Sequence, residues 1–305
     1  MSRQCRFDVC LGLGACASPL GLDCDPKTGR YALAEAVNVD VVAGRLVRRP
    51  GCVRLGEGGF RSLFSHGPDL YGVRDDAIYR IPDQGEPRCL KSGLTPGAEV
   101  AFLGLGDTVY FANGFESGRI RDGAAGAWGG EPYPGPDRLG RYVSPPPGHL
   151  LAAHAGRIWL ADAAVVRFTL GAGLHDWVDA LAGFLPPVTG RVRLLRAVSG
   201  GLFIGDAAGV TFAAGNDPNT MTFARVCPAP PIPGSDATLA AGGRDASGGP
   251  DGLDAAGDAA VWAASDGIYL GRPTGAVVRL AAANIPDGRA RATVSHSRYL
   301  LCLTR

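Results

Sequence analysis

The sequence lacks several features that would place it in a familiar functional class. Its 30 basic residues include lysine only at Lys27 and Lys91, and 29 acidic residues reduce the net charge to +1. A nearly neutral chain has no general electrostatic footprint for nucleic acid. No run approaches the roughly 18 consecutive apolar residues that a membrane-spanning helix needs. We therefore predict neither specific nucleic-acid binding nor a membrane span.

Motifs that carry known chemistry are also missing. The sequence has no G-x-S-x-G nucleophile elbow, no P-loop and no metalloprotease helix motif. Gly12 and Gly14 are closely spaced but lack the strand-to-helix context of a dinucleotide site. The sialidase box S-x-D-x-G-x-x-W is absent, because the string at 265–267 (SDG) is compressed and lacks its tryptophan. We predict no catalytic residue, no cofactor and no metal site.

Acidic residues occur mainly at breaks between apolar runs. Aspartate favours such turns because its side chain hydrogen-bonds nearby backbone N–H groups. A glycosidase would instead need paired carboxylates. We favour the turn role for the aspartates Asp75, Asp76, Asp162, Asp206, Asp217 and Asp266.

Four-stranded units recur along the chain. Runs of alternating apolar residues are separated by turns rich in Gly, Pro or Asp, and four runs make one unit. A repeat of roughly 35–50 residues holding four strands is typical of a β-propeller, in which each unit forms one blade. The clearest units span residues 61–92 (RSLFSH, DLYGVR, AIYRIP, PRCLKS), 99–133 (EVAFLGL, DTVYFANG, SGRIRDG, AWGGEPY) and 193–227 (RLLRAVS, GGLFIGD, AGVTFAAG, MTFARVC).

One large aromatic residue marks the second strand of each unit. In the first five units it directly follows an aliphatic residue, so the pair occupies opposite faces of its strand. Packed blades bury both faces of a sheet, and we expect these aromatics to pack between blades. They are Tyr71, Tyr110, Trp159, Phe203, Trp262 and Tyr299.

The last unit is incomplete, since RATVSHS and RYLLCLT supply only two strands. Residues 36–55 (AVNVDVV, GRLVRR, GCVRL) supply strands that belong to no unit. We predict that strands from 36–55 share the last blade with those of 292–304, which closes a ring of six blades. Seven blades result if the N-terminal hairpin forms a separate blade with residues 6–22. The domains are then an arm at 1–35 and one propeller at 36–305, with a Gly/Asp-rich insertion at 242–258.

Eight cysteines allow three interpretations. Without a C-x-x-C pair a zinc site has little support, and disulfides would need an oxidising compartment. Buried free thiols are the favoured interpretation, and we expect the first four cysteines to be reduced. The cysteines are Cys5, Cys10, Cys16, Cys24, Cys52, Cys89, Cys227 and Cys302.

His66, His154 and His296 share one position, the end of the first strand of a unit. Equivalent positions in different blades lie around a ring and do not converge on one metal ion. We predict turn histidines that are satisfied by local hydrogen bonds.

The first residues, 1–17, resemble an export signal. Arg3 and Arg6 precede an apolar stretch, and the string at 13–16 (LGAC) looks like a lipoprotein cleavage box. Asp8 interrupts the apolar stretch, which is at the short end for a signal. We interpret the segment as part of the mature protein.

Several strings resemble phage tail and head–tail structural proteins. AEAVNVDVVAGRLVRRPGCVRL resembles an opening in such proteins, and VYFANGFESGRIRDG resembles one of their blades. HAGRIWLADAAVVRFT, SGGLFIGDAAGVTFAAGNDPNTM and AVWAASDGIYLG continue the similarity in order, over residues 36–280. The Cys-rich segment up to Asp25 is not a feature of that family.

The resemblance implies a non-catalytic subunit of a phage or phage-like tail, as a hub, nozzle or tail-tip part. It would be assembled in the host cytoplasm as a homo-oligomeric ring that contacts other tail or head–tail proteins. The insertion at 242–258 is our candidate for a partner contact. Two alternatives remain: a carbohydrate-active propeller enzyme, and a secreted or surface binding propeller.

Overall fold

The computed structural model describes five short N-terminal strands and residues 59–304, apart from 84, 138, 187, 240–257 and 296–297. Every regular element among these residues is a β-strand. They include no helix that is both long and apolar enough to cross a membrane. The predicted all-β class is confirmed.

Four units form four-stranded antiparallel sheets in which each strand pairs with the next along the sequence. Tight turns join the strands: Asp75 and Asp76 both have positive φ (47° and 59°), as a two-residue hairpin turn with the required twist demands. The first blade is β6 (Arg61–His66), β7 (Asp69–Arg74), β8 (Ala77–Ile81) and β9 (Arg88–Lys91). The second is β10 (Ala101–Leu105), β11 (Thr108–Ala112), β12 (Ser117–Arg121) and β13 (Ala124–Gly126). The fourth is β19 (Leu194–Val198), β20 (Gly201–Asp206), β21 (Gly209–Ala214) and β22 (Thr222–Cys227), and the fifth is β23 (Ala237–Leu239), β24 (Ala259–Ala264), β25 (Gly267–Gly271) and β26 (Val277–Ala282).

The third and sixth units are smaller. The third blade has β15 (Leu150–His154), β16 (Arg157–Asp162) and β17 (Val165–Phe168), and the pair β14 (Tyr142–Val143) and β18 (Val178–Asp179) stands beside it. The sixth unit is the hairpin of β27 (Arg289–Ser295) and β28 (Arg298–Thr304).

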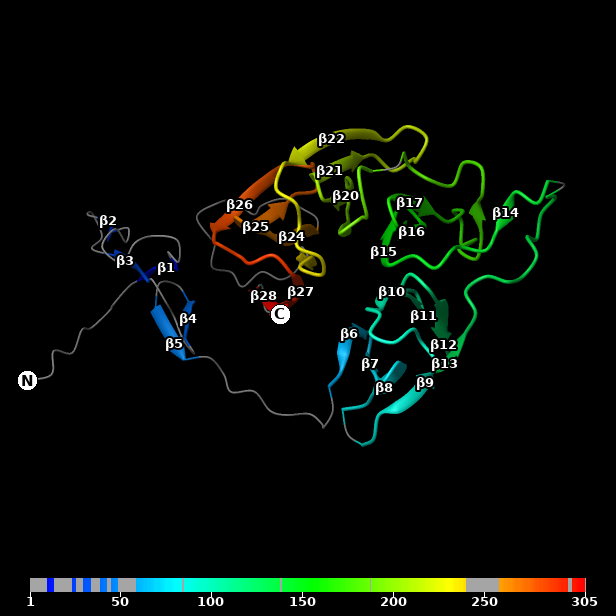
Figure 1. The fold of residues 1–305 in the computed structure, drawn as a ribbon, viewed down its shortest axis with the longest axis horizontal. Helices are drawn as coiled ribbons and strands as arrows, with labels where there is room; N and C mark the ends of the chain where they lie inside the picture. Colours follow the sequence, from blue (N-terminus) through cyan, green and yellow to red (C-terminus); the bar gives the residue numbers. More distant parts are fainter. Residues whose placement is uncertain are drawn as a thin grey trace, which may run out of the picture.

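The units are arranged around a ring (Figure 1). The first strands lie innermost and touch in succession: β6 contacts β10, β10 contacts β15, β15 contacts β19, and β23 contacts β27. Antiparallel meanders set around an axis with their first strands inside are the blades of a β-propeller. The predicted propeller is confirmed, with five blades of three or four strands and a two-stranded sixth unit.

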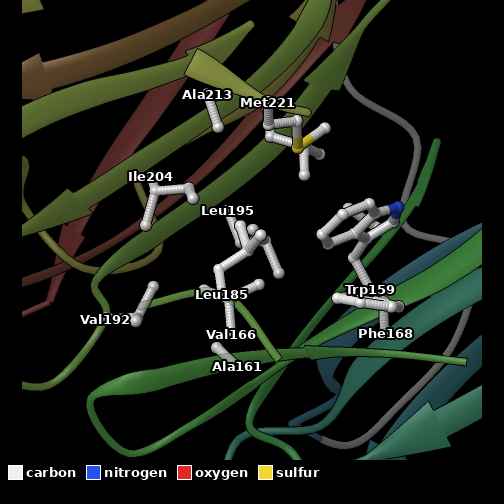
Figure 2. Close-up of a cluster of buried hydrophobic side chains, with 12 residues drawn as sticks. Trp159, Ala161, Val166, Phe168, Leu185, Val192, Leu195, Ile204, Ala213 and Met221 are labelled. Carbon is white, nitrogen blue, oxygen red and sulfur yellow. The ribbon is translucent and has the colours of Figure 1, made fainter. Parts of the chain in front are cut away.

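The aromatic anchors hold neighbouring blades together, as the sequence predicted. Trp159, Phe203 and Trp262 are fully buried on the second strands β16, β20 and β24. Figure 2 shows Trp159 of the third blade facing a cluster that includes Leu195, Ile204 and Met221 of the fourth. These second strands thus bury both faces, which explains why β20 and β24 lack the usual alternation of polar and apolar residues.

One predicted strand is wrong. AWGGEPY (127–133) is not the fourth strand of the second blade, because β13 at Ala124–Gly126 takes that place. Trp128 instead packs on Tyr110 and donates its indole N–H to the carbonyl of His175, which ties the second blade to the third. The bulky aromatics of this string serve a contact between blades rather than a strand.

The predicted sharing of the last blade is not found. β4 (Val39–Val42) and β5 (Arg45–Arg48) pair with each other, β27 and β28 pair with each other, and the described strands show no pairing between these hairpins. Figure 1 draws β4 and β5 outside the ring. In the β4–β5 hairpin each strand pairs only with the other, so the outer edge of each strand pairs with no described strand.

The N-terminal strands form no seventh blade among the described residues. β1 (Cys10–Leu13) pairs with β3 (Arg30–Leu33), which also pairs with β2 (Cys24–Asp25), while β4 and β5 form their own sheet. The division into an arm at 1–35 and a propeller at 36–305 stays a prediction.

Candidate functional site

Strand direction gives the ring two chemically different faces. The inner strands begin at one face, and antiparallel pairing brings the turns between second and third strands to that same face. Four predicted turn aspartates lie there, so we call it the acidic face: Asp76, Asp162, Asp206 and Asp266. The inner strands end at the opposite face, which we call the histidine face because His66 and His154 end β6 and β15 there.

Asp206 holds its own turn, as predicted, whereas Asp76, Asp162 and Asp266 bond to arginine or tyrosine side chains. Asp206 accepts hydrogen bonds from the backbone N–H groups of Thr189 (2.9 Å) and Ala208 (2.7 Å). Asp162 pairs with Arg167 at 3.1 Å. Asp217 also holds a turn, by accepting from the N–H of Asn219 (3.0 Å). Among the residues that the structure describes, no group of three or more His, Cys, Asp or Glu side chains could hold a metal ion.

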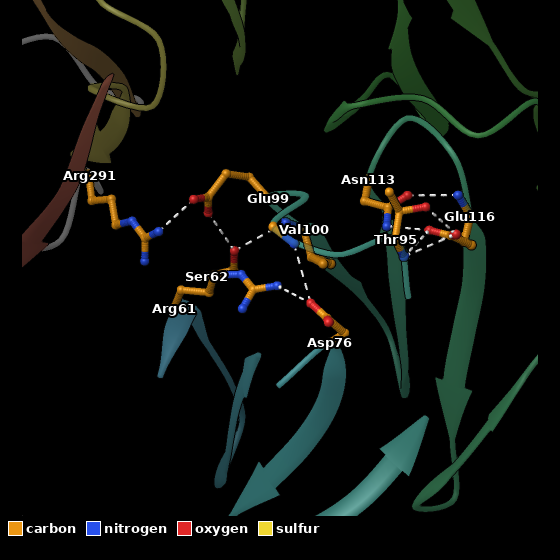
Figure 3. A network of polar contacts seen from close by, with 10 residues as sticks. Arg61, Ser62, Asp76, Thr95, Glu99, Val100, Asn113, Glu116 and Arg291 are labelled. Atoms are coloured by element: carbon orange, nitrogen blue, oxygen red, sulfur yellow. Dashed lines mark hydrogen bonds and ion pairs between the residues drawn. The ribbon is translucent and has the colours of Figure 1, made fainter. Parts of the chain in front are cut away.

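Glu99 joins three separate parts of the ring on the acidic face (Figure 3). Its Oε1 accepts from Arg291 Nη2 of β27 at 2.5 Å, and its Oε2 accepts from Ser62 Oγ of β6 at 2.9 Å. Ser62 Oγ in turn accepts from the N–H of Val100 at 3.1 Å. We call Glu99, Ser62 and Arg291 the Glu99 seam. It connects the sixth unit to the first and second blades through half-exposed groups.

A second carboxylate nearby is held by neutral donors. Glu116 accepts from Thr95 Oγ1 (2.6 Å), from the Thr95 N–H (3.1 Å) and from Asn113 Nδ2 (2.5 Å). Desolvation acts to raise the pKa of Glu116, but these hydrogen bonds together outweigh it and the pKa lies below its usual value. The ionised Glu116 carboxylate thus holds the loop after the first blade, which contains Thr95, against the second blade.

Polar contacts link the fourth blade to its neighbours at the same face. Arg196 Nε donates to Asp236 Oδ2 at 2.5 Å, and Asp236 is only 7% exposed. His149 Nε2 lies 2.8 Å from the carbonyl of Val192, and burial lowers the pKa of His149. Because a carbonyl only accepts, this nitrogen carries the proton. Arg196 and His149 therefore join the fourth blade to its two neighbours.

The two described histidines of the histidine face bond across blades. His66 Nε2 lies 2.8 Å from the carbonyl of Gly106, and His154 Nε2 lies 2.9 Å from that of Gly215. Hydrogen bonding rather than metal binding was predicted, but the partners belong to the next blade and are not local. His296 lies outside the described residues.

A groove of about 380 Å³ opens between the third and fourth blades at the histidine face. Its floor is formed by small apolar side chains, and exposed Ser199, Asn216 and Asp258 supply polar groups. Asp258 is the last residue of the predicted insertion, whose other residues lie outside the described part of the chain. The lining residues are Ala153, His154, Ala155, Ala197, Val198, Ser199, Asn216 and Asp258.

One hydroxyl–imidazole pair has the composition of a nucleophile with its general base. Thr169 Oγ1 lies 3.3 Å from His175 Nδ1, and burial lowers the pKa of His175. Thr169 is fully buried, and its hydroxyl accepts the N–H of Ile158 at 3.0 Å. No substrate reaches this oxygen, so the pair fixes β16 rather than reacts.

The described thiols differ in exposure, although Cys89, Cys227 and Cys302 all lie on the last strand of their unit. Cys227 is buried as predicted, and burial raises the pKa of its thiol. Cys89 and Cys302 are exposed, so the prediction of buried thiols is wrong for these two. They lie on β9 and β28, which are the outermost strands of their units. The side chains of Cys5, Cys10, Cys16, Cys24 and Cys52 lie outside the described residues.

Sequence reasoning missed an exposed apolar surface on the outer strands. Phe223 on β22, Val278 and Leu280 on β26, and Leu300 on β28 are between 41% and 53% exposed. The signal was present, because every residue of β26 (VVRLAA) except Arg279 is apolar although β26 is the outermost strand of its blade. The outer strands of the first two blades, RCLK and AAG, carry no such surface.

No protein-family model matches the chain, and no curated protein matches it. Among solved structures, a streptogramin B lyase is 14% identical with a TM-score of 0.45, over 76% of this chain and 72% of that chain. A catalytically inactive virginiamycin B lyase from Staphylococcus aureus with quinupristin is 15% identical, with a TM-score of 0.45 over 76% and 73% of the two chains. The WD40 domain of Neurospora crassa Pan2 is 12% identical, with a TM-score of 0.45 over 78% and 69%. At these identities and TM-scores, the likenesses carry no argument about function.

Proposed function

We propose that the chain is a non-catalytic structural subunit of a phage or phage-like tail, acting as a hub, nozzle or tail-tip part through protein–protein contacts. The observation that carries this proposal is that β22, β26 and β28, the last strands of their units, each expose large apolar side chains. Large apolar side chains that are exposed on several outer strands are candidate contact points for another protein. The resemblance of residues 36–280 to phage structural proteins supplies the kind of assembly.

The polar groups of the ring support the same proposal. Arg196, Glu99 and His149 hold blades together, and Glu116 holds the loop that leads into the second blade. Because these polar side chains are used for contacts between blades, they favour a structural role over a catalytic one. A rigid ring with loops at both faces suits a body that several neighbours must contact at once.

The test compares two substitutions in full-length protein. Leu280→Lys places a charge on β26, where Leu280 is 53% exposed, and Phe115→Lys does so on a second-blade turn, where Phe115 is 66% exposed. Both variants should melt like the wild type, because neither side chain is in the core. We expect Leu280→Lys to reduce incorporation into purified particles at least tenfold and Phe115→Lys to leave it unchanged. Absence of the wild-type protein from particles would overturn the proposal.

A binding propeller is the second candidate, and the groove at the histidine face favours it. Exposed Ser199, Asn216 and Asp258 above a floor of small apolar side chains suit a ligand rich in hydroxyl groups. Saturation-transfer NMR with mono- and disaccharides tests this function. Signals that Ser199→Trp abolishes would favour it, and their absence from the wild type would remove it.

A further inference from the structure

The sixth unit has an open edge where every other blade has a third strand. β27 and β28 pair along seven residue pairs, from Arg289 with Thr304 to Ser295 with Arg298. In the first five blades the second strand pairs with a third strand on its other side. Among the described strands, β28 has no such neighbour. Its outer backbone N–H and C=O groups therefore form an unused pairing edge.

The sequence of β28 is that of a buried strand. It reads RYLLCLT, yet Leu300 is 48% exposed and Leu303 is 39% exposed, and Cys302 is exposed beside them. The second strands β16, β20 and β24 bury their large side chains completely. An apolar edge strand without proline or lysine is a template for another strand.

The chain itself carries a two-stranded element of the required size. β4 and β5 have four residues each, and the third and fourth strands of the second blade have five and three. The hairpin pairs with no other described strand, and it lies outside its own ring (Figure 1). We propose that the edge of β28 binds the β4–β5 hairpin of a second copy of this chain, with β5 next to β28 as the third strand and β4 as the fourth strand of the sixth blade.

A second copy fits because the hairpin does not pair with the β28 of its own ring. Each molecule then both donates a hairpin and accepts one, so the contact is head-to-tail and yields a closed ring of copies or an open chain. This inference concerns the chain alone and does not rest on membership in a phage particle.

A disulfide between native Cys302 and an introduced Val47→Cys tests the contact. Cys302 is exposed on β28, and Val47 is 46% exposed on β5. Neighbouring strands bring such residues within the roughly 4.4–6.8 Å between Cα atoms that a disulfide needs. After mild oxidation of the full-length variant, we expect covalent dimers and larger species on non-reducing electrophoresis. The matched control, Val47→Cys with Cys302→Ser, should lose them, as should Phe115→Cys.

Two results would overturn the proposal. One is a disulfide between residues 47 and 302 of the same chain, found by peptide mass analysis of the monomer, because the hairpin then pairs with β28 of its own ring. The other is the absence of any 47–302 disulfide.

Light scattering of the full chain gives an independent readout. We expect a concentration-dependent oligomer that Leu300→Lys shifts towards monomer at least tenfold and that Leu280→Lys on β26 leaves intact. A wild type that is monomeric at all concentrations also contradicts the proposal. Because Leu280→Lys reports on particle incorporation and Leu300→Lys on self-association, failure of one proposal is distinguishable from failure of the other.

Discussion

The boundary between the third and fourth blades differs in kind from the seam between the sixth unit and the first two blades. At the first, Trp159, Leu202 and Ile204 belong to a cluster of buried apolar side chains drawn from both blades. At the second, Arg291, Glu99 and Ser62 meet through half-exposed polar groups. Apolar clusters also join the first blade to the second, the second to the third, the fourth to the fifth, and the fifth to the sixth unit.

The difference follows from strand number. A blade with at least three strands presents a broad apolar face to its neighbour, and such a face gains many small dispersion contacts. The two-stranded sixth unit presents a narrow face, and no apolar cluster among the described residues spans it and the first blade. The ring is therefore strongly packed along most of its circumference and weakly joined at one place.

The largest effect is expected at the packed boundary. Trp159→Ala should lower the free energy of unfolding by about 3–5 kcal/mol, because it leaves a cavity where a fully buried indole stood. The same holds for Trp262→Ala. Urea denaturation followed by circular dichroism measures the loss. Trp177→Ala, at a partly exposed tryptophan, is the matched control and should cost much less, and near-zero losses at both buried sites would contradict the packing role.

An intermediate effect is expected at the fourth and fifth blades. Arg196→Ala removes the partner of Asp236, which is 7% exposed, and leaves a buried carboxylate with fewer hydrogen bonds. We expect a loss of about 2 kcal/mol. The double variant with Asp236→Asn should recover part of it, since the stranded charge is then gone. Equal losses in the single and double variants would show that the pair is not coupled.

A smaller effect is expected at the Glu99 seam. Arg291→Ala and Glu99→Gln should each cost about 0–1 kcal/mol, because both side chains are more than a third exposed and solvent screens their attraction. The effect should shrink further in high salt. A double-mutant cycle in low and high salt measures the coupling. A loss as large as that of Trp159→Ala would erase the distinction between the two boundaries.

The smallest effect is a pH dependence at the third and fourth blades. Burial lowers the pKa of His149 below 6.5 in the folded chain, so the unfolded chain binds a proton first as the pH falls. The stability that neutral His149 contributes is present above pH 6.5 and is lost as the pH falls below it. His149→Gln should flatten the dependence of the urea midpoint on pH between 7 and 5. An unchanged slope would assign the dependence to other groups.

The blades were predictable from the sequence because their signals are local. Alternation along β6 to β9, the Asp75–Asp76 turn and the aromatic anchors each depend on a few neighbouring residues. The same reasoning missed β13, because AWGGEPY carries two aromatic residues of the kind that favour strands. The indole N–H of its tryptophan instead donates to a carbonyl far along the sequence. Propensity does not show which aromatic residue packs within a blade and which packs between blades.

The site was less predictable because its partners are far apart in the sequence. Glu99 and Arg291 are separated by 192 residues, and neither position carries a motif. His66 and His154 were identified, but their acceptors in the next blade depend on how blades stack. The sequence of β26 showed that the strand is apolar. Its exposure follows from its position as the outermost strand of its blade, which the sequence did not show.

Uneven packing around the ring has a mechanical consequence. Apolar packing makes nearly all contacts between blades stiff, and the Glu99 seam is the exception. An external force on the ring would therefore deform it mainly at the Glu99 seam. Opening there needs only the separation of half-exposed polar groups, which water can replace at little cost. The blades could then spread or close around an axial load as rigid bodies, with their own cores undisturbed.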